Sequence, residues 1–270
     1  MISQSVVPPE PGAPAPLVLR HAAPYAYDLG ISPDSGPVAM VEERLPFSVR
    51  VVGDAEALHK AVYIRHAAYA RHVPDLARNL QQPEAADFAD GAVVLLAESH
   101  LDGSPLGTMR IQTNRYAPLA LEESLPLPPE LGSSLLAEAT RLGVAEGREG
   151  TLVKTVLFKA FYLYCLHSGI DWMVVTGRAP IDRQYLRMLF EDVYPERGYI
   201  PMSHVGNLPH RVLKFEVRTA QERWAKVHHP LFKFMVETHH PDILLDMPVE
   251  DSEPDSAPAP VELTAPLQIM

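Results

Sequence analysis

The sequence predicts a mixed α/β (α+β) fold, in which helices cover both faces of a mostly antiparallel central sheet. Three observations favour this class. About 47% of the 270 residues are hydrophobic and 21% are charged, as in a globular protein with a sizeable core. Strand-like segments alternate along the chain with helix-like ones in the order β-α-β-β-β-α-β-α-β. An Asp102-Gly103 turn separates two of the strand-like segments, as in a β-hairpin.

The folded part is predicted to span residues 46–245. Residues 1–45 are rich in proline and are predicted to form a disordered arm, and residues 246–270 an acidic, proline-rich, disordered tail. No basic stripe dominates any segment, which argues against a nucleic-acid partner. We expect a cytoplasmic protein, because neither a signal peptide nor a transmembrane segment is visible and the single cysteine, Cys165, lies in an apolar run.

The first half of the folded part contains a strand, a helix and two further strands. Residues 47–52 alternate between apolar and polar side chains, as in a half-buried strand. Asp54 can cap a helix that runs to about Arg71, because its carboxylate can accept a hydrogen bond from a free amide of the first turn. The apolar run 92–97 and the segment 106–113 flank the Asp-Gly turn and are predicted to pair.

The second half contains three more strands and two helices. Residues 135–144 read as a strand. Thr151 is predicted to cap a long helix that ends at Gly169. A buried strand, a helix and a late strand follow, at residues 172–176, 182–190 and 211–217.

Arg65 lies on the apolar face of the first predicted helix. It shares that face with Leu58, Val62 and Tyr69, at spacings of three and four residues. An arginine at such a position either reaches solvent at the edge of the sheet or meets a carboxylate. The sequence leaves both interpretations open.

Charged residues from other segments can meet Arg65. Asp87 and Asp90 precede the second predicted strand, and Arg110 lies on the polar face of the third. Glu138 and Arg141 face opposite sides of a regular strand, so a β-bulge between them would bring both to one side and break the pairing with the next strand. Such a network either positions an amine or carboxylate substrate or only joins the sheet to its loop.

These residues, in this order, resemble the signature of acyl-homoserine-lactone (autoinducer) synthases. They are still more similar to the related long-chain N-acyl amino acid synthases. The resemblance spans roughly residues 47–217 and rests on the motifs Arg65-x-x-x-Tyr69, Asp87-x-x-Asp90, Gly107-Thr-Met-Arg110 and Glu138-x-Thr-Arg141. Both groups belong to the GNAT superfamily and take acyl groups from acyl carrier protein, so the resemblance implies a GNAT-like sheet that is split by a bulged strand.

The resemblance also implies a reaction. A long-chain acyl group would move from a phosphopantetheine thioester, of acyl carrier protein or of CoA, to the amine of an amino acid. His72-Val-Pro-Asp75 stands where autoinducer synthases usually have a tryptophan, which disfavours S-adenosylmethionine as the amine donor. Neither a tightly bound cofactor nor a metal is expected.

The implied roles fall into three groups. Glu138 would handle the proton, Arg141 and Arg110 would set its charge, and Tyr185 would protonate the leaving thiolate. The substrate-binding residues would be Arg65, Tyr69, Asp87, Asp90, Thr140, Leu142, Gly143 and Val144, with the backbone near 142–144 as the oxyanion donor. The phosphopantetheine arm would contact Arg148, Gly150, Thr151 and Lys154, at the start of a helix.

An acyl carrier protein is acidic, so its docking surface should be basic. The residues predicted to form that surface are Arg148, Lys154, Lys159, Arg178, Arg183 and Arg187. Three alternatives stay open: an acyl-CoA-dependent GNAT enzyme, an acyl-homoserine-lactone synthase, and a non-catalytic domain that binds acyl chains or a protein. The segment from His204 to His210 is interpreted as a packing loop, with a substrate contact left open.

Overall fold

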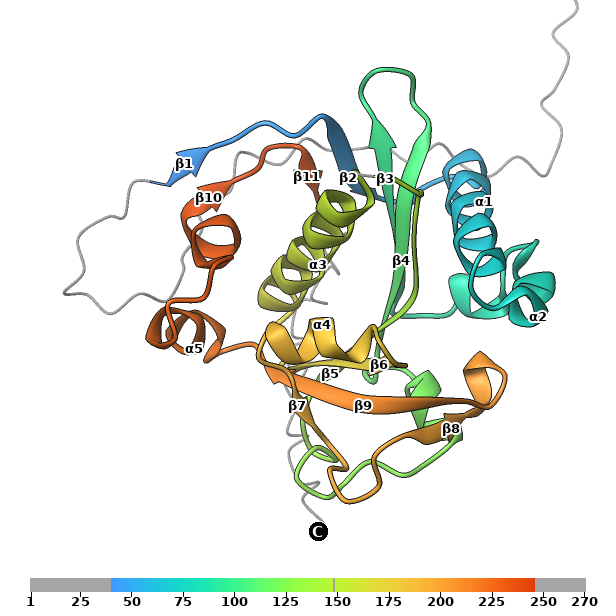
Figure 1. Ribbon diagram of the computed structural model, residues 1–270, viewed down its shortest axis with the longest axis vertical. Coiled ribbons are helices and arrows are strands. Elements are labelled where there is room, and N and C mark those ends of the chain that lie inside the picture. The colour runs from blue at the N-terminus through green and yellow to red at the C-terminus, as the bar shows by residue number, and fades with distance from the viewer. Residues whose placement is uncertain (1–39, 148, 246–270) are drawn as a thin grey trace, which may run out of the picture. The chain divides into compact units, whose positions relative to one another are not determined.

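The computed structural model describes residues 40–147 and 149–245, and its main element is a nine-stranded sheet (Figure 1). The strand order is β11-β2-β3-β4-β5-β6-β9-β7, and β8 pairs with β9. The pairs β5–β6 and β11–β2 are parallel and the others are antiparallel. The strands of this sheet are β2 (Phe47–Val51), β3 (Ala92–Ser99), β4 (Pro105–Thr113), β5 (Leu136–Val144), β6 (Trp172–Gly177), β7 (Glu191–Asp192), β8 (Ile200–Met202), β9 (Leu208–Glu216) and β11 (Ile243–Leu244).

The helices are short apart from two. The α-helices are α1 (Ala55–Ala70), α2 (Pro74–Ala77), α3 (Glu149–His167), α4 (Asp182–Arg187) and α5 (Ala220–Lys226). The other helical turns are η1 (Arg78–Leu80), η2 (Ala85–Asp87), η3 (Ala120–Glu123), η4 (Ser203–Val205) and η5 (Lys233–Glu237). A separate two-stranded ladder joins β1 (Val41–Glu42) to β10 (Thr238–His239). No helix of the described residues is both long and apolar enough to cross a bilayer.

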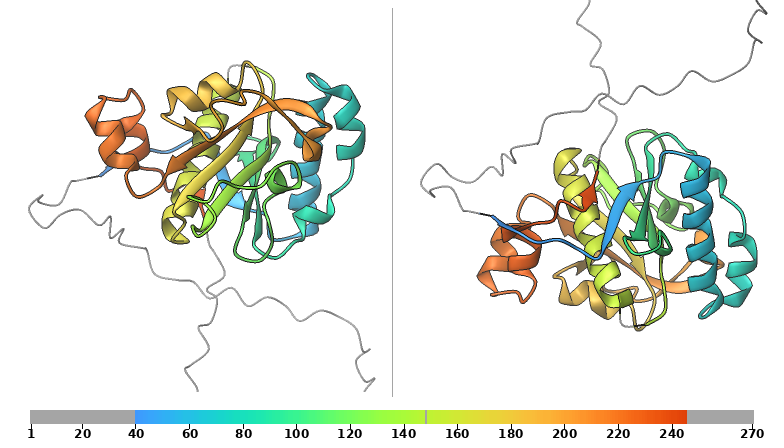
Figure 2. Two further views of the ribbon diagram at one scale, coloured as in Figure 1. Left: turned by 90° about the horizontal axis from the view of Figure 1, so that it is seen from below. Right: turned by 90° about the horizontal axis from the view of Figure 1, so that it is seen from above.

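The two long helices pack on opposite faces of the sheet, as Figures 1 and 2 show. Successive side chains of a strand point to opposite faces, so β4 contributes to both. Met109 and Ile111 join the main core with the apolar face of α3. Arg110, between them, faces α1, where it meets the same ion cluster as Arg65. The predicted fold class is confirmed, including helices on both faces of the sheet.

Most predicted elements are present, with changed ends. Asp54 caps α1 as predicted, and its Oδ1 accepts a hydrogen bond from Ala57 N at 2.8 Å. The predicted cap at Thr151 is wrong, because α3 begins two residues earlier, at Glu149. The helix predicted over 182–190 ends at Arg187. The two-residue strands at the ends of the described chain were missed, because two residues carry no detectable period.

The sheet opens between β5 and β6. Their parallel pairing runs from Leu136–Trp172 to Ala139–Val175 and no further. On its other side β5 stays paired with β4, but the register shifts: Thr108 faces Gly143 and Arg110 faces Thr140. One residue of β4 therefore faces two of β5, and one of these two, Arg141, has a φ of 54°. Among the described strands, residues 140–144 thus have a partner on one side only.

Helix α1 lies directly against this part of β5. A Cβ atom added at Gly143 would lie 3.1 Å from the Cβ of Ala68 and 3.2 Å from the Cα of Arg65. Glycine at this position therefore permits the close approach of helix and strand, whatever role it has in binding substrate.

We expect Gly143→Ala to lower the free energy of unfolding by about 1–3 kcal/mol, because α1 or β5 must shift to admit the methyl group. Urea denaturation measures the effect. Gly53→Ala is the control, since a Cβ there meets nothing within 4 Å. Equal stabilities of the two variants would contradict the close approach.

Candidate functional site

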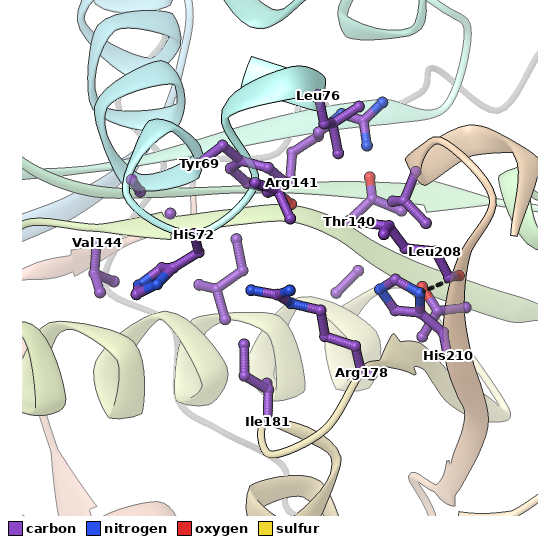
Figure 3. A pocket seen from close by; sticks show the side chains of 18 of the residues that line it. Tyr69, His72, Leu76, Thr140, Arg141, Val144, Arg178, Ile181, Leu208 and His210 are labelled. Carbon is purple, nitrogen blue, oxygen red and sulfur yellow. Dashed lines mark hydrogen bonds between the residues drawn. The ribbon is translucent and has the colours of Figure 1, made fainter. Parts of the chain in front are cut away.

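A cavity of about 320 Å³ lies where β5 and β6 diverge (Figure 3). One wall is β5, from Ala139 to Val144. The opposite wall is formed by the end of β6, the loop after it and α4. The last turn of α1 with the segment up to Leu76, and the segment from His204 to His210, close the remaining sides. Residues far apart in the sequence thus meet around the part of β5 that lacks a second neighbour.

A cluster of buried ions lies behind the β5 wall, on the α1 side of the sheet. Arg65 and Asp87 are its centre, and both side chains are fully buried. Nη2 of Arg65 donates to Oδ1 of Asp87 at 2.8 Å, and Nη1 donates to Oδ2 at 2.9 Å. This bidentate pair joins α1 to the loop before β3. Burial alone would raise the pKa of Asp87, but hydrogen bonds and the charge of Arg65 hold it below its usual value.

Glu84 connects this pair to the cavity wall. Nε and Nη2 of Arg141 each donate to a carboxylate oxygen of Glu84 at 2.7 Å. Arg65 and Arg110 also donate to Oε2 of Glu84, both at 3.2 Å. Two carboxylates, those of Glu84 and Asp87, therefore contact three guanidinium groups. The three predicted arginines and Asp87 meet as predicted, but Glu84 takes part in place of the other two predicted acids, Asp90 and Glu138.

Removing one member of this cluster leaves its partner buried and unpaired. We therefore expect Arg65→Met to lower the free energy of unfolding by about 3–5 kcal/mol. Arg78→Met is the matched control, because the Arg78–Asp75 pair is largely exposed and such pairs contribute about 1 kcal/mol or less. Guanidinium denaturation of both variants gives the comparison, and a loss below about 1 kcal/mol for Arg65→Met would contradict a buried ion pair.

Glu138 lies beside the cluster without an ion pair to it. Its side chain is fully buried, and Oε2 accepts a hydrogen bond from the backbone N–H of Leu121 at 3.1 Å. Among the described residues no group hydrogen-bonds to Oε1, and the nearest cationic or imidazole nitrogen is Nε2 of His204, 3.9 Å away. Burial raises the pKa of Glu138 to about 7, against the opposing effects of the Leu121 N–H and of Arg110. This carboxyl can therefore hold or release a proton near neutral pH.

The raised pKa predicts a pH-dependent stability. Because the folded protein binds this proton more tightly than the unfolded chain, wild-type stability falls between about pH 4.5 and pH 7 through this group. Glu138→Gln removes the titration, so its free energy of unfolding should rise relative to wild type across that range, by a few kcal/mol, and level off above it. Urea denaturation at pH 5, 6, 7 and 8 tests this. A difference that is constant with pH would exclude the raised pKa.

Several predicted site residues line the cavity. They are the predicted substrate-binding residues Tyr69, Thr140, Leu142, Gly143 and Val144, the predicted catalytic residues Arg141 and Tyr185, and the predicted phosphopantetheine contact Lys154. Arg65, Asp87, Arg110 and Glu138 lie behind the wall instead. Burial raises the pKa of Tyr185, so its phenol stays protonated at neutral pH.

Other predicted residues lie elsewhere. Asp90 is exposed and has no part in the ion cluster, so its assignment to that network is corrected to Glu84. Thr151 is exposed in the first turn of α3, and Gly150 is buried there; neither lines the cavity. Arg148 lies outside the described residues.

The predicted basic docking surface is divided by the structure. Lys159 cannot belong to it, because its side chain is buried and Nζ donates to the backbone oxygen of Phe234 at 2.6 Å and meets Nδ1 of His240 at 2.9 Å. The segment 234–240 lies against α3 and covers the side chain of Lys159. Arg178 and Lys154 line the cavity, and only Arg183 and Arg187 stay exposed on α4.

Sequence reasoning missed several residues that the fold brings to the site. Glu84 precedes Asp87 by three residues and its backbone N–H donates to Oδ2 of Asp87 at 2.8 Å, but nothing in the sequence indicated that its carboxylate would meet Arg141. The cavity residues His72 and Thr176 gave no signal either, because they lie in segments that are far apart in the sequence. Within residues 40–147 and 149–245, no group of three His, Cys, Asp or Glu side chains is arranged to hold a metal ion.

Comparison with known proteins adds information on the fold. No protein-family model matches this chain, and no curated protein matches its sequence. Among solved structures, FeeM, an N-acyl amino acid synthase from uncultured soil microbes, superposes with a TM-score of 0.52 at 17% identity, over 67% of this chain and 96% of FeeM. BjaI, a CoA-dependent acyl-homoserine lactone synthase, superposes with a TM-score of 0.47 at 16% identity, over 72% of this chain and 93% of BjaI. The AHL synthase LasI gives 0.47 at 16% identity, over 64% and 93%.

The FeeM likeness shows the fold. The chain has the fold of FeeM, a mixed α/β fold with a mostly antiparallel central sheet and helices on both faces. A shared fold does not fix an activity. The activity therefore rests on the site itself.

Proposed function

We propose that this protein is an N-acyltransferase that moves a long-chain acyl group from a phosphopantetheine thioester to the amine of an amino acid. The observation that carries the proposal is the opening of the sheet beyond Ala139, with a cavity in the gap and an ion cluster behind one wall. The likeness to an N-acyl amino acid synthase supports the same reading at the level of fold.

The gap suits the donor arm. Residues 140–143 have no described strand on the side away from β4, and an extended pantetheine chain can hydrogen-bond to such an edge as an added strand does. The oxygen of Val144 already accepts a hydrogen bond from Nη2 of Arg71 at 2.6 Å. Lys154, on the second turn of α3, reaches the cavity and can meet a phosphate near the helix N-terminus. Apolar lining groups such as Leu142, Val144 and Ile181 can contact the start of an acyl chain.

The charges of the cavity suit an acceptor that carries a carboxylate. The described lining includes Arg71, Arg141, Lys154 and Arg178 and no Asp or Glu. Figure 3 shows the guanidinium of Arg178 extending from the loop after β6 into the cavity. A cation that faces such a space favours an anionic ligand, and a guanidinium binds a carboxylate through two parallel hydrogen bonds.

The chemistry would proceed by direct attack. The neutral amine attacks the thioester carbonyl, the C–N bond forms, and the C–S bond breaks as the thiolate leaves. Backbone N–H groups near residues 142–144, which line the cavity, would stabilise the oxyanion, and Tyr185 is a protonated phenol that can protonate the thiolate. The proton lost by the amine needs a base.

Incubation of the purified protein with single amino acids and either an acyl carrier protein thioester or an acyl-CoA tests the proposal. Mass spectrometry should detect N-acyl amino acids and one equivalent of free thiol for each product. The donor that gives the higher kcat/KM identifies the carrier. A lactone product from S-adenosylmethionine, or no acyl transfer with either donor, would overturn the proposal.

Arg178→Gln tests the proposed carboxylate contact. It should raise KM for the amino acid about tenfold or more, equivalent to at least about 1.4 kcal/mol, and leave KM for the donor nearly unchanged. Arg183→Gln is the matched control, since Arg183 is exposed on α4 and does not line the cavity. Replacing the amino acid by the corresponding amine without the carboxylate should remove the difference between wild type and Arg178→Gln. Equal effects of the two variants would exclude the contact.

A further inference from the structure

Glu138, the carboxylate that the resemblance implies for proton transfer, does not reach the cavity. Its side chain is fully buried and is not part of the cavity wall. His204 lines the cavity and lies next to Glu138: its Nε2 is 3.9 Å from Oε1 of Glu138 and 3.4 Å from Oγ1 of Thr176. The imidazole therefore stands between the buried carboxyl and the space where a substrate would bind.

Two atoms of this pair have no hydrogen-bond partner among the described residues. They are Oε1 of Glu138 and Nδ1 of His204, and both are buried. Burying such atoms without a hydrogen-bond partner is unfavourable. An imidazole whose side chain is only 6% exposed, with one nitrogen near a carboxyl and the other free, is arranged like the base of a catalytic dyad.

The surrounding structure holds both groups in place. The turn η3 donates the Leu121 N–H to Oε2 of Glu138, which leaves Oε1 on the side of His204. The residue after η3, Ser124, accepts a hydrogen bond from the backbone N–H of Ser203 at 2.8 Å, so the same segment anchors the turn that carries His204.

Arg141 supports that turn from the other side. Its Nη2 donates to the backbone oxygen of His204 at 3.0 Å. The ion cluster therefore reaches the backbone of His204 through Arg141, the residue of β5 with a left-handed conformation.

We propose that His204 is the general base that accepts the proton of the attacking amine, and that Glu138 is a positioning residue that orients the imidazole and shares its charge. This inference rests on the proposed acyl transfer. It assigns the proton transfer to a histidine that lies outside the motifs of the sequence resemblance. Glu138 alone does not reach the cavity and so cannot accept the proton directly.

The proton balance is complete. As the C–N bond forms, the amine loses one proton to the neutral imidazole of His204, which becomes an imidazolium beside Oε1 of Glu138. As the C–S bond breaks, Tyr185 protonates the thiolate, and the imidazolium returns one proton to the phenolate directly or through solvent. The products are one amide and one thiol, and both side chains regain their starting state.

The charges that face His204 favour its neutral form before the reaction. Burial lowers its pKa to about 4, and the charges of Arg141, His210 and Arg110 act in the same direction, whereas Glu84 opposes them. Glu138 adds its own negative charge only when ionised. A neutral imidazole is the form that can accept a proton.

Steady-state kinetics of purified variants test the proposal. His204→Gln should lower kcat by about 10²–10⁴-fold with KM for both substrates changed by less than about threefold. His59→Gln is the control, because His59 is exposed on α1 and does not line the cavity.

Two further measurements separate a base from a structural role. Added imidazole should restore activity to His204→Gly in proportion to its concentration, and not to Arg178→Gln. Glu138→Gln should lower kcat in wild type and have little further effect in the His204→Gln background, because both variants remove the same dyad. Full kcat in His204→Gln, or additive losses in the double variant, would overturn the proposal. If wild type itself transfers no acyl group, the proposed function fails before this inference is reached.

Discussion

The structure depends on one buried electrostatic constraint: the Arg65 guanidinium lies in the apolar interface between a helix and the sheet and must be neutralised there. Asp87 does so with two hydrogen bonds, and both side chains are fully buried. Such a pair stabilises little compared with apolar side chains of the same volume, but breaking it is costly. The pair therefore contributes mainly to the specificity of the fold, because it joins α1 to the loop before β3.

Glu84 extends this constraint to the cavity. One carboxylate contacts arginines from α1, β4 and β5, and Arg141 then reaches the backbone of His204. The cluster thus joins α1, β4, β5 and the turn that carries His204. These segments meet where β5 has no second neighbouring strand among the described residues. A sheet edge with unpaired backbone groups would otherwise tend to close or to bind another chain. The ion cluster anchors the segments that surround this edge.

The sequence predicted the parts of this arrangement that have a period or a local signal. The 3.6-residue period placed Arg65 on the buried face of α1, and the two-residue period placed Arg110 and Met109 on opposite faces of β4. The contribution of Glu84 and the burial of Lys159 were not predictable in this way. Both depend on where a distant segment folds back, and charged residues in a single sequence read as surface unless a partner is visible. The cavity itself collects side chains from segments between Ala68 and His210, so its composition appears only in three dimensions.

Strand β11 covers the edge of β2 at one end of the sheet. It pairs with β2 through only two residue pairs, Ile243–Val49 and Leu244–Arg50. Without it, β2 would be an outermost strand with its amide and carbonyl groups open to solvent, beside the apolar side chains of Phe47 and Val49. An open strand of this kind is a template for intermolecular addition. The short return of the chain at residues 243–244 therefore acts as a cap against self-association, and the solubility of shortened versions should depend on keeping it.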